Sequence, residues 1–122
     1  MKLLVVEDEP LIRLGLADVL EEAGYEVAEA ANASEAILVL EADPSIRLVL
    51  TDVDMPGDMD GIALAQYVRK RWPPVQIVVV SGKIGLDLSK LPFGSRFIGK
   101  PYQQDQMLSL VHSLVPNDGG PR

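Results

Sequence analysis

The sequence has 122 residues, of which 48% are hydrophobic and 24% are charged, the usual balance for one globular domain with a buried core. A formal net charge of −7 argues against nucleic acid or an anionic membrane as a direct partner, because both attract basic surfaces. The absence of cysteine excludes disulfides, a thiol nucleophile and a cysteine-based zinc site.

Short apolar runs alternate with amphipathic stretches along the chain. The runs have the length of buried strands, and the stretches repeat apolar residues at helical spacing. In chain order, the predicted elements are a strand over residues 3–6, a helix over 10–23, an edge strand over 25–29, a helix over 34–42, a strand over 48–51, a helix from 60–61 to about 72, a central strand over 75–80, a strand over 96–99 and a helix over 103–115. The first apolar run is too short for a signal peptide or a membrane span, so we expect a cytoplasmic protein.

This alternation predicts an α/β fold with a parallel sheet that is covered by helices on both faces. We expect one domain over residues 1–116 and a disordered tail over residues 117–122. Sheets of this kind bind ligands at the carboxyl ends of their strands.

Polar residues end four of the apolar runs. Glu7 and Asp8 follow the first run, Asp52 follows the third, and Ser81 and Lys100 follow the last two. Because the strands are predicted to be parallel, these residues should converge on one edge of the sheet. Three carboxylates, a hydroxyl and an ammonium group would then share one small site.

The three carboxylates of Glu7, Asp8 and Asp52 indicate a cation site. Two like charges about 4 Å apart repel by roughly 4 kcal/mol at a surface-like dielectric, so the cluster needs a cation or a raised pKa. Oxygen ligands favour Mg²⁺, with Mn²⁺ or Ca²⁺ as substitutes, over zinc. Because Mg²⁺ commonly binds carboxylates together with phosphate oxygens, the set suggests phosphate chemistry.

Lys100 and Ser81 add groups that can hold phosphoryl oxygens. An ammonium group can neutralise one oxygen, and a hydroxyl can donate a hydrogen bond to another. Asp52 would be the nucleophile and would form an acyl phosphate. The chain has no phosphate-binding loop motif, so ATP is not expected as the direct donor.

Each of these residues also has a purely structural interpretation. Asp8 could cap the helix that starts at Pro10, and Asp52 and Asp54 could form a turn before Pro56. The Ser81-Gly82 pair could be a simple turn, and Lys100 could be a solvated loop residue. The functional interpretation depends on all four positions falling at the same edge in the right order.

The ordered motifs resemble the receiver domain of two-component response regulators, of the chemotaxis-regulator type. The resemblance covers residues 2 to about 115. It is carried by Val-Val-Glu7-Asp8-Glu-Pro, Thr-Asp52-Val-Asp-Met-Pro56, Asp60-Gly61, Val-Val-Val-Ser81-Gly82 and Lys100-Pro101. It implies a flavodoxin-like (βα)5 fold with strand order 2-1-3-4-5.

The resemblance also implies roles for the residues at the sheet edge. Asp52 would accept a phosphoryl group from a phosphohistidine on a histidine kinase or a histidine phosphotransfer protein. Asp8 and Asp52 would bind Mg²⁺ directly, together with the backbone carbonyl of Asp54, while Glu7 would act through water. Ser81 and Lys100 would hold the phosphoryl oxygens.

Two departures from the family pattern concern loops. Asp58 adds one residue to the usual Met-Pro-Gly-Met-Asp-Gly segment, which predicts a slightly longer loop. The segment from Ser81 to Lys100 should contain the family's fourth helix, but it is interrupted by proline and glycine. Only residues 87–91 could form a turn, so we expect this helix to be short, mobile or absent.

Three further positions would tune the switch. Phe97 matches the aromatic switch position of the family, but it has no hydroxyl for the hydrogen bond of a tyrosine. Asp54 and Lys83 lie two residues beyond Asp52 and Ser81, where family members flank the path of the attacking water. An ion pair between them could shield the phosphoryl group and set its lifetime.

The expected function is a phosphorylation-controlled switch with no recognisable output domain. It would change its binding to an unknown downstream protein or pass the phosphoryl group along a relay, as a monomer or as a weak, phosphorylation-dependent dimer. It would catalyse only its own phosphoryl transfer and dephosphorylation. The alternatives are an aspartyl-phosphate phosphatase, suggested by Asp52-Val-Asp54, and an interaction module that is never phosphorylated.

Overall fold

The computed structural model describes residues 1–83 and 85–116, so the predicted tail over residues 117–122 lies outside the described residues. The elements, in chain order, are β1 (Lys2–Val6), α1 (Pro10–Glu22), β2 (Glu26–Ala30), α2 (Ala33–Ala42), β3 (Ile46–Asp52), α3 (Gly61–Arg71), β4 (Gln76–Ser81), the 3-10 helix η1 (Leu88–Lys90), β5 (Arg96–Gly99) and α4 (Gln104–Leu114). Among these residues, no helix combines the length and the apolar character needed to cross a membrane.

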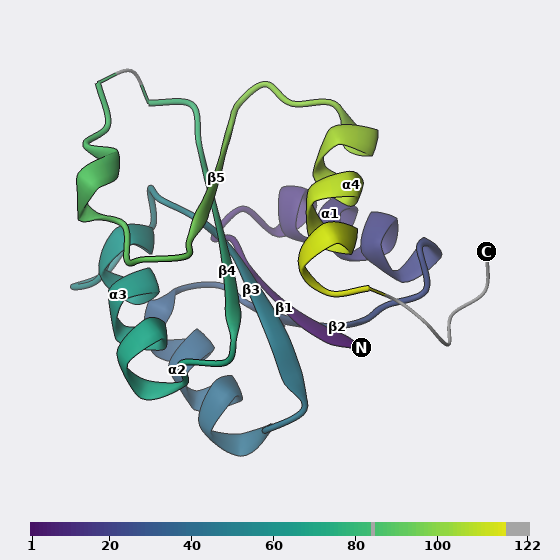
Figure 1. Ribbon diagram of the computed structural model, residues 1–122, viewed down its shortest axis with the longest axis horizontal. Coiled ribbons are helices and arrows are strands. Elements are labelled where there is room, and N and C mark those ends of the chain that lie inside the picture. The colour runs from purple at the N-terminus through teal and green to yellow at the C-terminus, as the bar shows by residue number, and fades with distance from the viewer. Residues whose placement is uncertain (84, 117–122) are drawn as a thin grey trace.

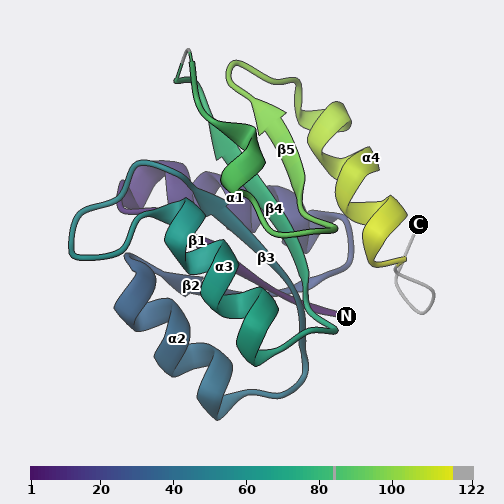
Figure 2. The same ribbon diagram turned by 60° about the vertical axis from the view of Figure 1, so that its left-hand side comes forward.

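The five strands form one parallel sheet in the order β2-β1-β3-β4-β5, which confirms the predicted topology. Figures 1 and 2 show α1 and α4 on one face of this sheet and α2 and α3 on the other. The strand predicted as central over residues 75–80 is β4, which lies next to the middle strand; β3 is the middle strand. The β-branched residues of β4 indicate burial on both faces, which an interior strand next to the centre also has.

The sheet separates two hydrophobic clusters, and successive residues of each strand point to opposite clusters. In β3, Val49 joins the cluster under α2 and α3, while Leu48 and Leu50 join the cluster under α1 and α4. Tyr25 belongs to the cluster under α1 and α4, and its hydroxyl donates a hydrogen bond to the carbonyl of Val115 at 2.7 Å. Both faces are therefore buried, as a doubly wound sheet requires.

The connection between β4 and β5 contains only one turn of 3-10 helix within the described residues. Gly85 and Gly94 adopt positive φ angles of 80° and 85°, which an α-helix does not accommodate. Leu86 and Leu91 nevertheless pack against the cluster under α3, and the Gln66 side-chain amide donates to the carbonyl of Lys90 at 2.6 Å. The described residues of this segment pack against the cluster without forming the family's fourth helix.

Candidate functional site

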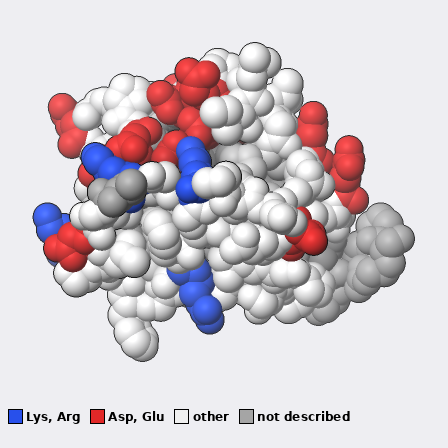
Figure 3. Space-filling model, turned by 90° about the horizontal axis from the view of Figure 1, so that it is seen from above, with Lys and Arg blue, Asp and Glu red and all other residues white. Residues whose placement is uncertain are grey.

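Three carboxylates meet at the carboxyl edge of the sheet. Glu7, Asp8 and Asp52 each place a carboxylate oxygen within 4.8 Å of the others. The first two follow β1 and the third ends β3, and these neighbouring strands are in register with Val6 opposite Thr51. Figure 3 shows acidic side chains gathered on this side of the molecule, with basic side chains beside them.

Glu7 is the buried member of the cluster, with only 3% of its surface exposed. Burial raises the pKa of its carboxyl to about 7, and the neighbouring carboxyls of Asp8 and Asp52 add to this rise. One hydrogen bond opposes it, because the Glu9 amide donates to Glu7 Oε2 at 3.0 Å. The site is therefore short of positive charge around this carboxyl, which is the condition that a divalent cation would relieve.

Lys100 supplies the cation nearest to Asp52 in the described structure, with Nζ 3.1 Å from Asp52 Oδ2. Burial lowers the pKa of the lysine, but the hydrogen bond and charge of Asp52 outweigh it, and the net shift is upward. The backbone fixes the approach, since the Lys100 amide donates to the carbonyl of Ser81 at 3.0 Å. The Asp52 side chain remains 12% exposed, so a reagent can reach its carboxylate.

Ser81 is buried at the end of β4, one residue beyond the partner of Asp52 in the strand register. Its Oγ accepts a hydrogen bond from the Lys83 amide at 3.0 Å, so the hydroxyl proton is available for another acceptor. Ser81 therefore lies at the same edge as the acids and Lys100, as the sequence predicted.

Asp54 and Lys83 form the ion pair anticipated from the sequence. Lys83 Nζ lies 3.4 Å from Asp54 Oδ1, and the two side chains are 62% and 60% exposed in the order Asp54, Lys83. The Asp54 amide also donates to Asp52 Oδ1 at 3.3 Å, which ties this loop to the central carboxylate. The pair joins the loop after β3 to the loop after β4.

Phe97 lies in β5 opposite Val79 of β4 and is half-buried against the cluster under α2 and α3. Its ring also contacts Gly99, since a β-carbon at residue 99 would stand 3.7 Å from Phe97 Cε2. Leu86 and Leu91 of the β4–β5 connection pack against the same cluster as Phe97.

Several residues around the site were not identified from the sequence. Glu9, and not Asp8, is the residue that precedes α1, and its side chain makes no capping hydrogen bond, so the interpretation of Asp8 as a helix cap is wrong. Tyr102 is half-buried near Lys100, and burial raises the pKa of its hydroxyl. Thr51 is fully buried and its Oγ1 donates to the Asp52 carbonyl at 2.9 Å.

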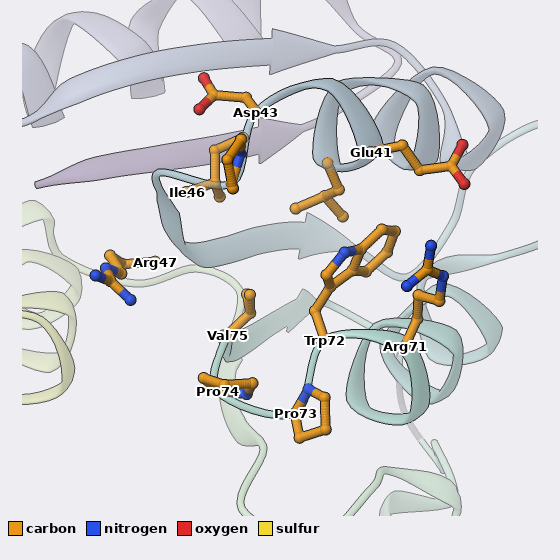
Figure 4. A pocket seen from close by; sticks show the side chains of 11 residues that line it. Glu41, Asp43, Ile46, Arg47, Arg71, Trp72, Pro73, Pro74 and Val75 are labelled. Atoms are coloured by element: carbon orange, nitrogen blue, oxygen red, sulfur yellow. The ribbon is translucent and has the colours of Figure 1, made fainter.

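A cavity of about 330 Å³ lies at the opposite end of the sheet, where α2 and α3 end (Figure 4). Trp72 points into it, and the Arg71 guanidinium stands 5.2 Å from the centre of the indole ring. None of the acids of the strand-end cluster lines this cavity. Trp72 is partly buried and packs against the core, and the acidic cluster lies at the other edge of the sheet.

Comparison with known proteins points to one family. The family model for the response regulator receiver domain matches residues 3–112. The chain is 30% identical over 112 residues to the putative response regulator NtrX-like of Rickettsia bellii, covering 88% of this chain but 23% of that protein. It is 33% identical over 118 residues to chemotaxis protein CheY of Thermotoga maritima, covering 93% of this chain and 96% of that protein.

Solved structures agree with the sequence matches. The structure is similar to response regulator protein TrrA of Thermotoga maritima, determined in complex with Mg²⁺ and BeF, with a TM-score of 0.83 and 31% identity. The alignment covers 93% of this chain and 98% of that one. The chain thus spans less than a quarter of its NtrX-like relative but nearly the whole of TrrA and CheY.

Proposed function

This chain belongs to the response regulator receiver domain family, and on that premise we propose that Asp52 accepts a phosphoryl group and thereby switches the binding of another protein. The observation that carries the proposal is the 3.1 Å contact between Lys100 Nζ and an accessible carboxylate oxygen of Asp52, inside a cluster of two further acids. A lysine held this way can neutralise charge that a phosphoryl group brings to Asp52.

The proposed reaction is transfer from a phosphohistidine on a histidine kinase or a histidine phosphotransfer protein. An Asp52 carboxylate oxygen attacks the phosphorus atom, a P–O bond forms, and the P–N bond to the imidazole breaks. Lys100 and the Ser81 hydroxyl bind the equatorial phosphoryl oxygens. The product is an acyl phosphate on Asp52 and a free histidine on the donor.

The acidic cluster fits a hard divalent cation, because its donors are all carboxylate oxygens and one of them is buried with a raised pKa. We propose Mg²⁺, with Mn²⁺ or Ca²⁺ as substitutes. Asp8 and Asp52 would bind it directly with the backbone carbonyl of Asp54, and Glu7 would act through water. When bound, the ion supplies positive charge that offsets both the acids and the phosphoryl oxygens.

The donor protein must contact the surface that surrounds Asp52, because its histidine has to reach a carboxylate that is mostly covered. The first turns of α1 follow Asp8 directly and expose apolar side chains there, with Leu11 82% exposed. Ile12 and Leu14 extend this apolar surface along the helix. We assign the docking of the donor to this surface, since exposed apolar groups of this size gain most from being covered.

Intact mass spectrometry after incubation with acetyl phosphate and Mg²⁺ tests the proposal. The parent should gain one phosphoryl group, and Asp52→Asn should not. Asp54→Asn is the matched control, since it removes a carboxylate two residues away with the same change in mass and charge, and it should still be phosphorylated. An adduct that persists in Asp52→Asn would contradict the proposal.

We propose that catalysis is limited to the chain's own phosphorylation and dephosphorylation. Repeated turnover of a small phosphate ester would instead indicate the phosphatase alternative. The downstream event is binding to another protein or relay of the phosphoryl group, with a monomer or a weak dimer as the working state.

A further inference from the structure

Arg13, in the first turn of α1, binds the backbone of the acidic loop, residues 7–9. Its Nη1 donates to the carbonyl of Glu7 at 2.8 Å, and its Nε donates to Glu29 Oε1 at 3.2 Å. Side chains on a helix point toward its N-terminus, which is why a residue of α1 reaches back to the end of β1. The guanidinium thereby connects the loop that carries Glu7 and Asp8 to the end of β2.

This loop has few other backbone restraints. The Glu7 amide donates to the carbonyl of Ala30 at 3.0 Å, the Glu9 amide donates to the carboxylate of Glu7 itself, and the Glu9 carbonyl accepts from the Arg13 amide at 2.9 Å. Arg13 is the one side chain that donates to a backbone carbonyl of residues 7–9 within the described part of the chain. Repulsion among the three carboxylates works against this arrangement, so a tether on the backbone is needed to keep the acids converged.

We expect Arg13 to act by fixing the position of the loop that carries Glu7 and Asp8, and not by pairing with their carboxylates. Its guanidinium donates to the carboxylate of Glu29 and to the backbone carbonyl of Glu7, so its hydrogen bond to the acidic loop is to the backbone. Arginine suits this task because its planar fork donates in two fixed directions at once, whereas a lysine ammonium is a compact point charge. The side chain is only 20% exposed, so its contacts are partly shielded from solvent.

We propose that Arg13 is a positioning residue for the cation site. By bridging the Glu7 carbonyl and the Glu29 carboxylate, it holds the side chains of Glu7 and Asp8 in place for the metal. The inference rests on the proposed function only in that the acidic cluster binds Mg²⁺. Outer-shell partners of this kind typically change metal affinity by about 10–100-fold when they are removed. Because Arg13 acts through the backbone, we expect the lower end of that range.

The test is a titration of the full chain with Mg²⁺ alone, followed by amide NMR chemical shifts, without any phosphoryl donor. Arg13→Met keeps the aliphatic stem and should raise the dissociation constant for Mg²⁺ about tenfold. Arg13→Lys and Glu29→Gln each keep part of the clamp and should give intermediate values. Arg47→Met is the matched control: it removes the same charge from an exposed position at the opposite end of the sheet and should leave the dissociation constant unchanged.

The outcomes separate the inference from the function it rests on. An Arg13→Met dissociation constant within twofold of the parent overturns the positioning role, even if Arg13→Met is less stable, because affinity is measured on the folded protein. An equal loss in Arg47→Met also overturns it, since the effect would then be one of net charge. Failure of the parent to bind Mg²⁺ removes the metal site and this role together, while phosphorylation of Asp52 is still decided by the mass measurement.

Discussion

The α-carbon of Gly61 faces the backbone carbonyl of Asp52 so closely that a β-carbon at residue 61 would overlap with that carbonyl oxygen and stand 2.8 Å from the carbonyl carbon. The Gly61 amide donates to the carbonyl of Val53 at 2.8 Å, and Asp60 caps α3 by accepting from the Ala63 amide. Helix α3 therefore begins directly against the end of the strand that carries Asp52.

Gly61→Ala should destabilise the protein, because strand β3 or helix α3 would have to move. We expect a loss of about 1–3 kcal/mol in the free energy of unfolding, as for other overpacked sites. Gly15→Ala is the control: a β-carbon there would meet no atom within 4 Å beyond its chain neighbours and the backbone of its own helix, so it should stabilise α1 by about 0.5–1 kcal/mol. Urea unfolding measures both, and equal stabilities of Gly61→Ala and the parent would refute the contact.

Glu7 should make the metal-free protein less stable as pH rises. Its pKa is about 7 in the folded state against 4.5 ordinarily, so the folded state holds more protons between these values, and stability falls across that window. Glu7→Gln should remove this fall. The free energy of unfolding of Glu7→Gln relative to that of the parent should grow from pH 4.5 to 7, by at most ~3 kcal/mol.

Asp43 provides a comparison of opposite sign. The hydrogen bond from Lys2, at 2.6 Å, lowers the pKa of its carboxyl to about 2. Asp43→Asn should therefore cost stability above pH 4, and the cost should vanish as pH falls toward 2. Unfolding measured from about pH 2 to about pH 7 covers both windows, and parallel pH profiles for Glu7→Gln and the parent would show that Glu7 is not perturbed.

Lys100→Met should slow phosphorylation of Asp52 by acetyl phosphate about 100-fold, because it removes a charge placed to stabilise the transferring phosphoryl group. Lys90→Met removes the same charge from an exposed turn and should leave the rate unchanged. The rate of appearance of the phosphorylated mass measures the effect. Similar slowing in both variants would assign it to net charge and not to the contact with Asp52.

The ion pair of Asp54 and Lys83 should set the lifetime of the phosphorylated state. Asp54→Ala or Lys83→Ala should change the dephosphorylation rate, while stability changes by no more than about 1 kcal/mol because the pair is exposed. Decay of the phosphorylated mass after removal of the donor gives the rate. The proposal fails if both variants decay at the parent's rate.

Amide hydrogen exchange should be fast across residues 85–93. The described hydrogen bonds of this segment close only one turn, through the amides of Ser89, Lys90 and Leu91. By contrast, the amides of β4 are paired in the sheet interior and should be strongly protected. Strong protection over the whole segment would show that a regular helix forms there in solution.

The positions of the acids, Ser81 and Lys100 could be predicted because parallel strands align their ends, so each polar residue after an apolar run maps to one edge. The middle position of β3 followed only from the family resemblance, since the composition of a strand reports its burial and not its neighbours. The clamp of Arg13 and the close approach of Gly61 were missed. Both join residues whose proximity depends on the angle between a helix and the sheet, which periodicity does not encode.

β3 has a hydrogen-bonded strand on each side up to its last residues, with Val6 opposite Thr51 and Val80 opposite Asp52. Asp52 thus ends a strand that is hydrogen-bonded on both sides up to Thr51, whereas the described β4–β5 connection on one flank is held by a short turn and the Gln66 side chain. If Asp52 is phosphorylated as proposed, we expect the backbone to rearrange in the β4–β5 connection rather than in β3, because fewer hydrogen bonds hold that connection.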